Sequence, residues 1–160
     1  MGGQALTSAG VHVRTAEVAE RGALEGLMMR ASVASTRYAE ELRAHPDAVA
    51  VPAEQFEDGL VRVAERDGEV AGFAVLLPPV DRVCELDAIF VEPSAMGAGV
   101  GRVLIEDAVA RARDWRAADI QVVANPDATG FYERVGFTQG DEVATRFGPG
   151  LRMRRRVGEA

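Results

Sequence analysis

The chain has 160 residues, 48% apolar and 27% charged, which predicts one globular domain with a sizeable core. The net charge of −7 argues against a general nucleic-acid-binding surface, which needs an excess of basic side chains. The longest apolar run is too short to span a membrane, and the single cysteine, Cys84, excludes an internal disulfide. One cysteine is typical of a reducing compartment, so we expect a cytoplasmic protein.

The first ten residues lack the basic start and the apolar core of a signal peptide. We therefore expect residues 1–10 to be a disordered leader. No repeat, low-complexity tract or linker divides the rest, so residues 11–157 are predicted to be a single domain.

The N-terminal half of this domain predicts a strand, two helices and a hairpin. Apolar residues recur at helical spacing after the first strand, and Pro46 ends the second helix. The dipeptide Asp67-Gly68 separates two β-rich runs, which is typical of a hairpin turn. The elements are expected at residues 11–16, from residue 17, and at residues 36–45, 60–66 and 69–77.

The C-terminal half predicts a strand, a helix, a strand, a short helix ended by Gly136, and two closing strands around residues 148–150. The first three of these elements are expected at residues 83–91, 101–115 and 120–125. This order indicates a mixed α/β sheet with helices on its faces.

Three alternate glycines, Gly97, Gly99 and Gly101, join a proline-bearing loop to the longest helix of this half. A phosphate-binding P-loop is excluded because it ends in Gly-Lys-Ser/Thr and the chain contains no lysine. The dinucleotide fingerprint has a different glycine spacing. Glycines let a ligand approach the backbone, and a helix start offers unpaired N–H groups to an anion, so the loop suits a pyrophosphate. A glycine-rich turn without a ligand is the alternative.

Two segments together resemble the signatures of the GCN5-related N-acetyltransferase (GNAT) family. In the first, Val91, Pro93 and the three glycines match, but Met96 stands where the family usually has Gln or Arg, so weaker cofactor binding is expected. In the second signature the matching residues are Asn125, Ala128, Phe131, Tyr132, Glu133, Arg134, Gly136 and Phe137. The resemblance is tight over about residues 85–137.

The resemblance implies the GNAT fold: a mixed, mostly antiparallel sheet of six to seven strands, splayed between its fourth and fifth strands, with helices on both faces. It also implies acetyl-CoA as acyl donor. His12 and His45 have no partners at ligand spacing, so no metal is expected. A β-bulge in the fourth strand would free an N–H for the thioester carbonyl, but the pattern of residues 84–91 leaves the bulge undecided. The residues expected to bind the cofactor are Ile89, Phe90, Val91, Met96, Gly97, Ala98, Gly99, Val100, Gly101, Arg102, Asn125, Ala128 and Phe131.

Tyr132 matches the general acid of the family. A phenol with a pKa near 10 is a weaker acid than a thiol near 8.5, so full proton transfer is uphill by about 2 kcal/mol. We therefore expect Tyr132 to hydrogen-bond the departing thiolate unless its pKa is lowered, with a role in core packing as the alternative. Glu85, six residues before Val91, has the register of a catalytic glutamate in the family, and Asp87 is the alternative base. Both carboxylates could instead be solvated.

Other reactive or charged residues favour structural interpretations. Cys84 could accept an acyl group, but a lone strand cysteine is more often a buried apolar residue. The basic run at residues 152–156 is expected to protect an edge strand. Arg111, Arg113 and Arg116 are expected on a solvated helix face, from which one could reach the 3′-phosphate of CoA.

The resemblance implies direct acetyl transfer, through a ternary complex, to a primary amine of a small molecule or peptide. A non-catalytic acyl-CoA sensor or partner-binding module is the alternative, and the presence of both Tyr132 and Glu85 favours the enzyme. The acceptor pocket would be formed by residues 21–46 and 143–151. We expect no nucleic-acid or membrane partner, and a homodimer is left open.

Overall fold

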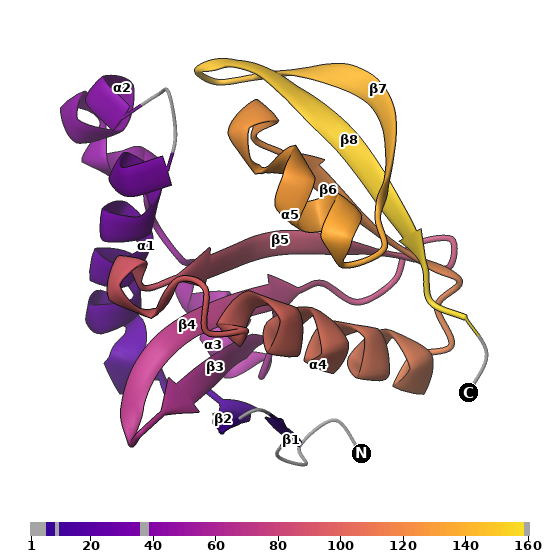
Figure 1. Ribbon diagram of the computed structural model, residues 1–160, viewed down its shortest axis with the longest axis horizontal. Coiled ribbons are helices and arrows are strands. Elements are labelled where there is room, and N and C mark those ends of the chain that lie inside the picture. The colour runs from indigo at the N-terminus through magenta and orange to yellow at the C-terminus, as the bar shows by residue number, and fades with distance from the viewer. Residues whose placement is uncertain (1–5, 9, 36–38, 159–160) are drawn as a thin grey trace.

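The computed structural model describes residues 6–8, 10–35 and 39–158. In these residues eight strands form one sheet in the order β1-β2-β3-β4-β5-β6-β8-β7 (Figure 1). All neighbouring strands are antiparallel except β5 and β6, which are parallel. This confirms the predicted mixed, mostly antiparallel sheet with helices on both faces.

The additional strand is β1, Leu6–Ser8, which pairs with β2, Val11–Thr15. It raises the strand number above the predicted six to seven. It also lies in the leader that we expected to be disordered, so that expectation is not met at these three residues. Residues 1–5 and 9 of the leader lie outside the described residues.

One face of the N-terminal half of the sheet is covered by α1, Arg21–Ser35, and α3, Ala53–Glu57. A 3₁₀ turn, Val18–Glu20, with a capping box between Glu17 and Glu20 precedes α1. The predicted second helix is the shorter α2, Ala39–Ala44, and residues 36–38 of that prediction lie outside the described part of the chain. The sequence analysis missed α3.

The strands beneath these helices are β3, Val61–Arg66, β4, Glu69–Leu76, and β5, Val83–Val91. The predicted hairpin is therefore present. Side chains of both strands and helices form one buried cluster, because the apolar residues alternate along the strands and recur at helical spacing on α1. This cluster includes Leu24, Leu27, Phe56, Val63 and Phe73.

The other face of the sheet is covered by α4, Val100–Asp114, which buries its apolar residues against β2 to β6. Asp107 of α4 forms a buried two-bond ion pair with Arg62 of β3, at 2.8 and 3.0 Å. Replacing either partner would strongly destabilise the fold, because the remaining charge would be buried and uncompensated. The pair therefore holds α4 on the sheet in one position.

The expectation of a solvated arginine face on α4 is wrong for Arg111. This side chain is buried, donates a hydrogen bond to the carbonyl oxygen of Gly59 at 3.1 Å and lies over the ring of Trp115. Arg113 and Arg116 are exposed, as expected.

The C-terminal half contains β6, Asp119–Ala124, α5, Thr129–Arg134, β7, Thr138–Thr145, and β8, Gly148–Arg156. The closing hairpin turns at Arg146 and Phe147, so the predicted turn at residues 148–150 is wrong and those residues begin β8. A Cβ on Gly150 would lie 2.8 Å from Val123 and 2.9 Å from Thr145, so this glycine permits close strand packing. No helix in the described residues is long and apolar enough to cross a membrane.

The basic run at residues 152–156 is in β8, which lies between β6 and β7. The prediction that it protects an edge strand is therefore wrong. Its arginines instead form contacts with neighbouring strands: Arg152 pairs with Asp141 at 2.6 Å, and Arg154 bonds Gln121 at 2.8 Å.

Candidate active site

The sheet opens between β5 and β6. Only Val83, Cys84 and Glu85 of β5 pair with β6, and beyond that point β6 pairs with β8 alone. The remaining half of β5 pairs with β4 on one edge, and on its other edge it presents backbone groups to an opening rather than to β6. This confirms the splay that the sequence analysis expected between the fourth and fifth strands of the family, which are β5 and β6 here.

A β-bulge lies in β5 at the start of this opening. Val75 of β4 pairs with Ala88 and the next residue, Leu76, pairs with Leu86, so Asp87 is an extra residue. The bulge reverses the faces of the strand. Leu86, Ile89 and Val91 pack with the α4 core, whereas Ala88 and Phe90 pack with the α1 core.

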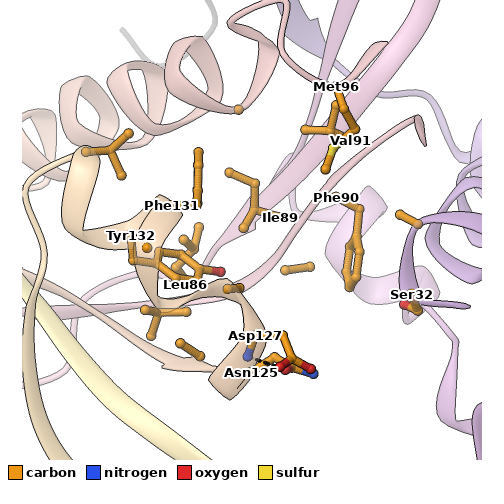
Figure 2. A pocket seen from close by; sticks show the side chains of 18 of the residues that line it. Ser32, Leu86, Ile89, Phe90, Val91, Met96, Asn125, Asp127, Phe131 and Tyr132 are labelled. Atoms are coloured by element: carbon orange, nitrogen blue, oxygen red, sulfur yellow. Dashed lines mark hydrogen bonds between the residues drawn. The ribbon is translucent and has the colours of Figure 1, made fainter. Parts of the chain in front are cut away.

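A cavity of about 800 Å³ fills the opening. All the residues predicted to bind the cofactor line it except Ala98, which packs against the core. Figure 2 shows Tyr132 and Phe90 facing each other from opposite sides of this cavity, with Asn125 and Asp127 between them along one edge. The side-chain oxygen of Asn125 accepts a hydrogen bond from the Asp127 backbone N–H at 2.8 Å and so caps the turn before α5.

The glycine loop enters α4 through two left-handed residues, Gly97 with φ of 83° and Gly99 with φ of 85°. Side chains are strained in this conformation, which accounts for glycine at both positions. The first hydrogen bond of the helix runs from the Val103 N–H to the Gly99 carbonyl oxygen. The N–H groups just before it have no acceptor within the helix and border the cavity, as an anion site requires.

Gly101 has a different role. A Cβ at this position would lie 2.9 Å from the Phe131 ring. The third glycine therefore lets α5 pack closely against the start of α4. This contact joins the two motifs, which are distant in sequence, into one wall of the cavity.

Tyr132 is 7% exposed, and its ring contacts Phe131 and Phe137 edge-on at 5.2 and 5.5 Å. Its hydroxyl group makes no hydrogen bond to any of the described residues and points toward the cavity in Figure 2. Burial raises the pKa of Tyr132 well above its ordinary value. The hydroxyl is therefore a hydrogen-bond donor that stays protonated at neutral pH.

The two candidate bases occupy different places. Asp87, in the bulge, lines the cavity and accepts a hydrogen bond from Gln55 of α3 at 3.0 Å. Glu85 does not line the cavity; it is half-buried and accepts a hydrogen bond from Gln121 at 3.2 Å. Burial raises the pKa of Glu85 above its ordinary value, and the nearby charge of Asp87 adds to this effect. The sequence analysis missed Gln55, which no motif marks.

Cys84 is completely buried, and burial raises the pKa of its thiol to about 11. The reactive form of cysteine is the thiolate, so this residue is unreactive where it lies. It is part of the core, as the preferred interpretation of the sequence holds.

Comparisons with known proteins agree with this geometry. The model of the acetyltransferase (GNAT) family matches residues 27–137. A peptidyl-lysine N-acetyltransferase, YjaB, of Escherichia coli (strain K12) is 40% identical over 77 residues, which are 48% of this chain and 47% of that protein. A 5-NmdU N-acetyltransferase of Pseudomonas phage PaMx11 is 36% identical over 89 residues, which are 54% of this chain and 63% of that protein. The chain thus matches less than two thirds of the length of either relative.

Solved structures show the same fold over nearly the whole chain. The PaiA N-acetyltransferase of Thermoplasma acidophilum, in complex with coenzyme A, has a TM-score of 0.76 at 15% identity and covers 91% of this chain and 98% of its own. The ribosomal-protein-S18-alanine N-acetyltransferase of Escherichia coli has a TM-score of 0.68 at 20% identity, with coverages of 94% and 96%.

Proposed function

Because this chain belongs to the acetyltransferase (GNAT) family, we propose that it transfers an acetyl group from acetyl-CoA to a primary amine through a ternary complex. One observation carries the proposal. The start of α4, the half of β5 that does not pair with β6 and the Tyr132 hydroxyl all border one cavity. They would serve the pyrophosphate, the pantetheine arm and the thiolate of the donor, in that order.

The residues fit the donor in their chemistry. The N–H groups at Val100, Gly101 and Arg102 would hold the pyrophosphate, with the favourable field of a 15-residue helix behind them. The exposed backbone of Ile89 to Val91 would pair with the amides of the pantetheine arm. Met96, which is 61% exposed beside the loop, offers no donor, so these backbone groups would carry most of the anion binding.

Acetyl-CoA is a substrate and supplies the acetyl group as a thioester. The amine nitrogen forms a bond to the acetyl carbon, the carbon–sulfur bond breaks, and its electron pair leaves with the sulfur. The Tyr132 hydroxyl donates a hydrogen bond to this thiolate but keeps its proton, because its pKa is raised by burial. The thiolate then takes its proton from water.

The amine must lose a proton before or during the attack. Glu85 would accept it, since its raised pKa makes it a better base than an ordinary carboxylate. Because Glu85 does not line the cavity, the proton would pass through a water molecule. Glu85 is therefore the proposed general base, and Asp87 has a separate role.

The rival is a module that binds acyl-CoA without turning it over. Calorimetry with acetyl-CoA, followed by a thiol-release assay across an amine panel, tests both. A ligand that binds only the folded state adds about 2.7 kcal/mol to the free energy of unfolding at a hundredfold excess over its Kd. Binding with amine-dependent release of CoA is expected. Binding without release for any amine would favour the module, and no binding at millimolar acetyl-CoA would refute both.

A further inference from the structure

The cavity extends past the bulge to the face of β5 opposite α4. This second end lies between α1 and α2 on one side and the tip of the β7–β8 hairpin on the other, and Figure 1 shows both at one end of the molecule. If the donor occupies the α4 side, as proposed above, the acceptor must enter here. The residues that line this end are Ala31, Ser32, Leu42, Phe90, Thr145, Phe147 and Pro149.

These walls are mostly apolar, and neighbouring contacts hold them in place. The Phe147 ring packs against His45 with centroids 5.7 Å apart, and the Arg146 guanidinium lies 5.0 Å from the same ring. Phe90 packs against the buried ring of Phe73. The hairpin tip therefore presents an aromatic side chain to the cavity from a braced position.

Two ion pairs lie beside residues that line this end of the cavity. Arg146 bonds Asp47 at 3.2 Å, and Arg30 forms a two-bond pair with Glu92 at 2.7 and 2.9 Å. Each of these arginines, next in sequence to a residue that lines this end, is therefore paired with a carboxylate. A second carboxylate, Asp127, lines the cavity beside Asn125.

Asp87 lines the cavity and forms no ion pair with any of the described residues. Its partner, Gln55, is neutral, so the hydrogen bond to Oδ2 orients the carboxylate without cancelling its charge. The other oxygen, Oδ1, accepts no hydrogen bond from the described residues, and the side chain is exposed to the cavity. An oriented carboxylate with an open oxygen is a suitable partner for one ammonium group.

We propose that the acceptor is a small primary amine with a single positive charge on an apolar body, whose ammonium group binds Asp87 first and then loses its proton through water to Glu85 before the attack. Gln55 is then a positioning residue that acts through Asp87, and Leu42, Phe90 and Phe147 contact the apolar body. This assignment of the acceptor rests on the proposed transfer reaction. It narrows the acceptor to one class, distinct from polyamines and from peptides with a polar backbone.

The first test compares three probes on the wild-type protein: phenethylamine, 1,4-diaminobutane and the dipeptide alanyl-alanine. We expect kcat/KM for phenethylamine to exceed the other two at least about tenfold, because its phenyl ring would bury more apolar surface in the cavity than either of them. A preference for the diamine or the dipeptide would overturn the assignment of the acceptor class.

The second test uses Asp87→Asn, Gln55→Leu and Gln55→Glu. Asp87→Asn should raise the KM for phenethylamine about tenfold or more and leave the KM for acetyl-CoA unchanged, and Gln55→Leu should do the same to a smaller extent. Gln55→Glu places a second carboxylate beside Asp87, so the acid limb of kcat/KM should move to higher pH. Loss of a merely structural contact would not move this limb.

Glu57→Gln, an exposed change on the same helix, is the matched control and should alter none of these values. Unchanged KM and an unmoved acid limb in the Asp87 and Gln55 variants would overturn the proposal while the transfer reaction stands. If no amine is turned over, the transfer reaction fails, but calorimetry of phenethylamine with the CoA-saturated protein still decides the site. Binding to the wild type that Asp87→Asn abolishes supports it, and equal or absent binding refutes it.

Discussion

Removing the Tyr132 hydroxyl group is the sharpest test of how the leaving thiolate is stabilised. In Tyr132→Phe the ring keeps its edge-on contacts with Phe131 and Phe137, and the lost hydroxyl has no hydrogen-bond partner in the described protein. The free energy of unfolding should therefore change by less than about 1.5 kcal/mol, as for other volume-conserving changes. A hydrogen bond to a charged group contributes about 1.5–3 kcal/mol, so kcat should fall roughly 10- to 150-fold.

The assay measures CoA release with a thiol-reactive dye at saturating amine, alongside the Kd of acetyl-CoA by calorimetry. The Kd should stay within about twofold of the wild type, because the hydroxyl is needed by the thiolate and not by the bound thioester. A kcat within about threefold of the wild type would show that the hydroxyl does not serve the thiolate. An equal loss in kcat and in acetyl-CoA affinity would instead make Tyr132 a binding residue.

Three further predictions concern the loop, the buried carboxylate and the absence of lysine. Gly99→Val should leave a folded protein that no longer binds acetyl-CoA. Gly68 has a similar φ of 79° but lies away from the cavity, so Gly68→Val should strain the fold equally and still bind acetyl-CoA. Equal binding by both variants would refute the anion site. Glu85→Gln should raise the free energy of unfolding at pH 7, because burial raises the folded-state pKa of Glu85 and the charged form is therefore unfavourable in the folded protein. This gain should disappear below the unfolded pKa of about 4.3, where Glu85 is protonated in both states. A difference between the two proteins in urea melts that does not depend on pH would contradict this. Incubation with acetyl-CoA should give little or no self-acetylation by mass spectrometry, since the chain has no lysine and Cys84 is buried; stoichiometric acetylation of Cys84 would replace direct transfer by a covalent intermediate.

The sequence alone determined the family, the order of most elements and most of the residues that line the cavity wall proposed for the donor. The glycines at positions 97 and 99 could be recognised because they need a left-handed backbone, and this need is local. The spacing of apolar residues likewise predicted α4 to within about one residue at each end, because one face of the helix must be buried. Such features depend on neighbours in the sequence.

Only the tertiary structure decided which carboxylate faces the cavity. The bulge at Asp87 follows from the pairing of β5 with β4, and in the folded chain Asp87 lines the cavity while Glu85 does not. The bond from Gln55 to Asp87 joins residues 32 positions apart, and no motif records it. The same holds for β8. It is an interior strand, not an edge strand, because β7 pairs with its outer edge. Strand order, register and distant side-chain contacts depend on how the whole chain packs, and a local pattern contains no information about them.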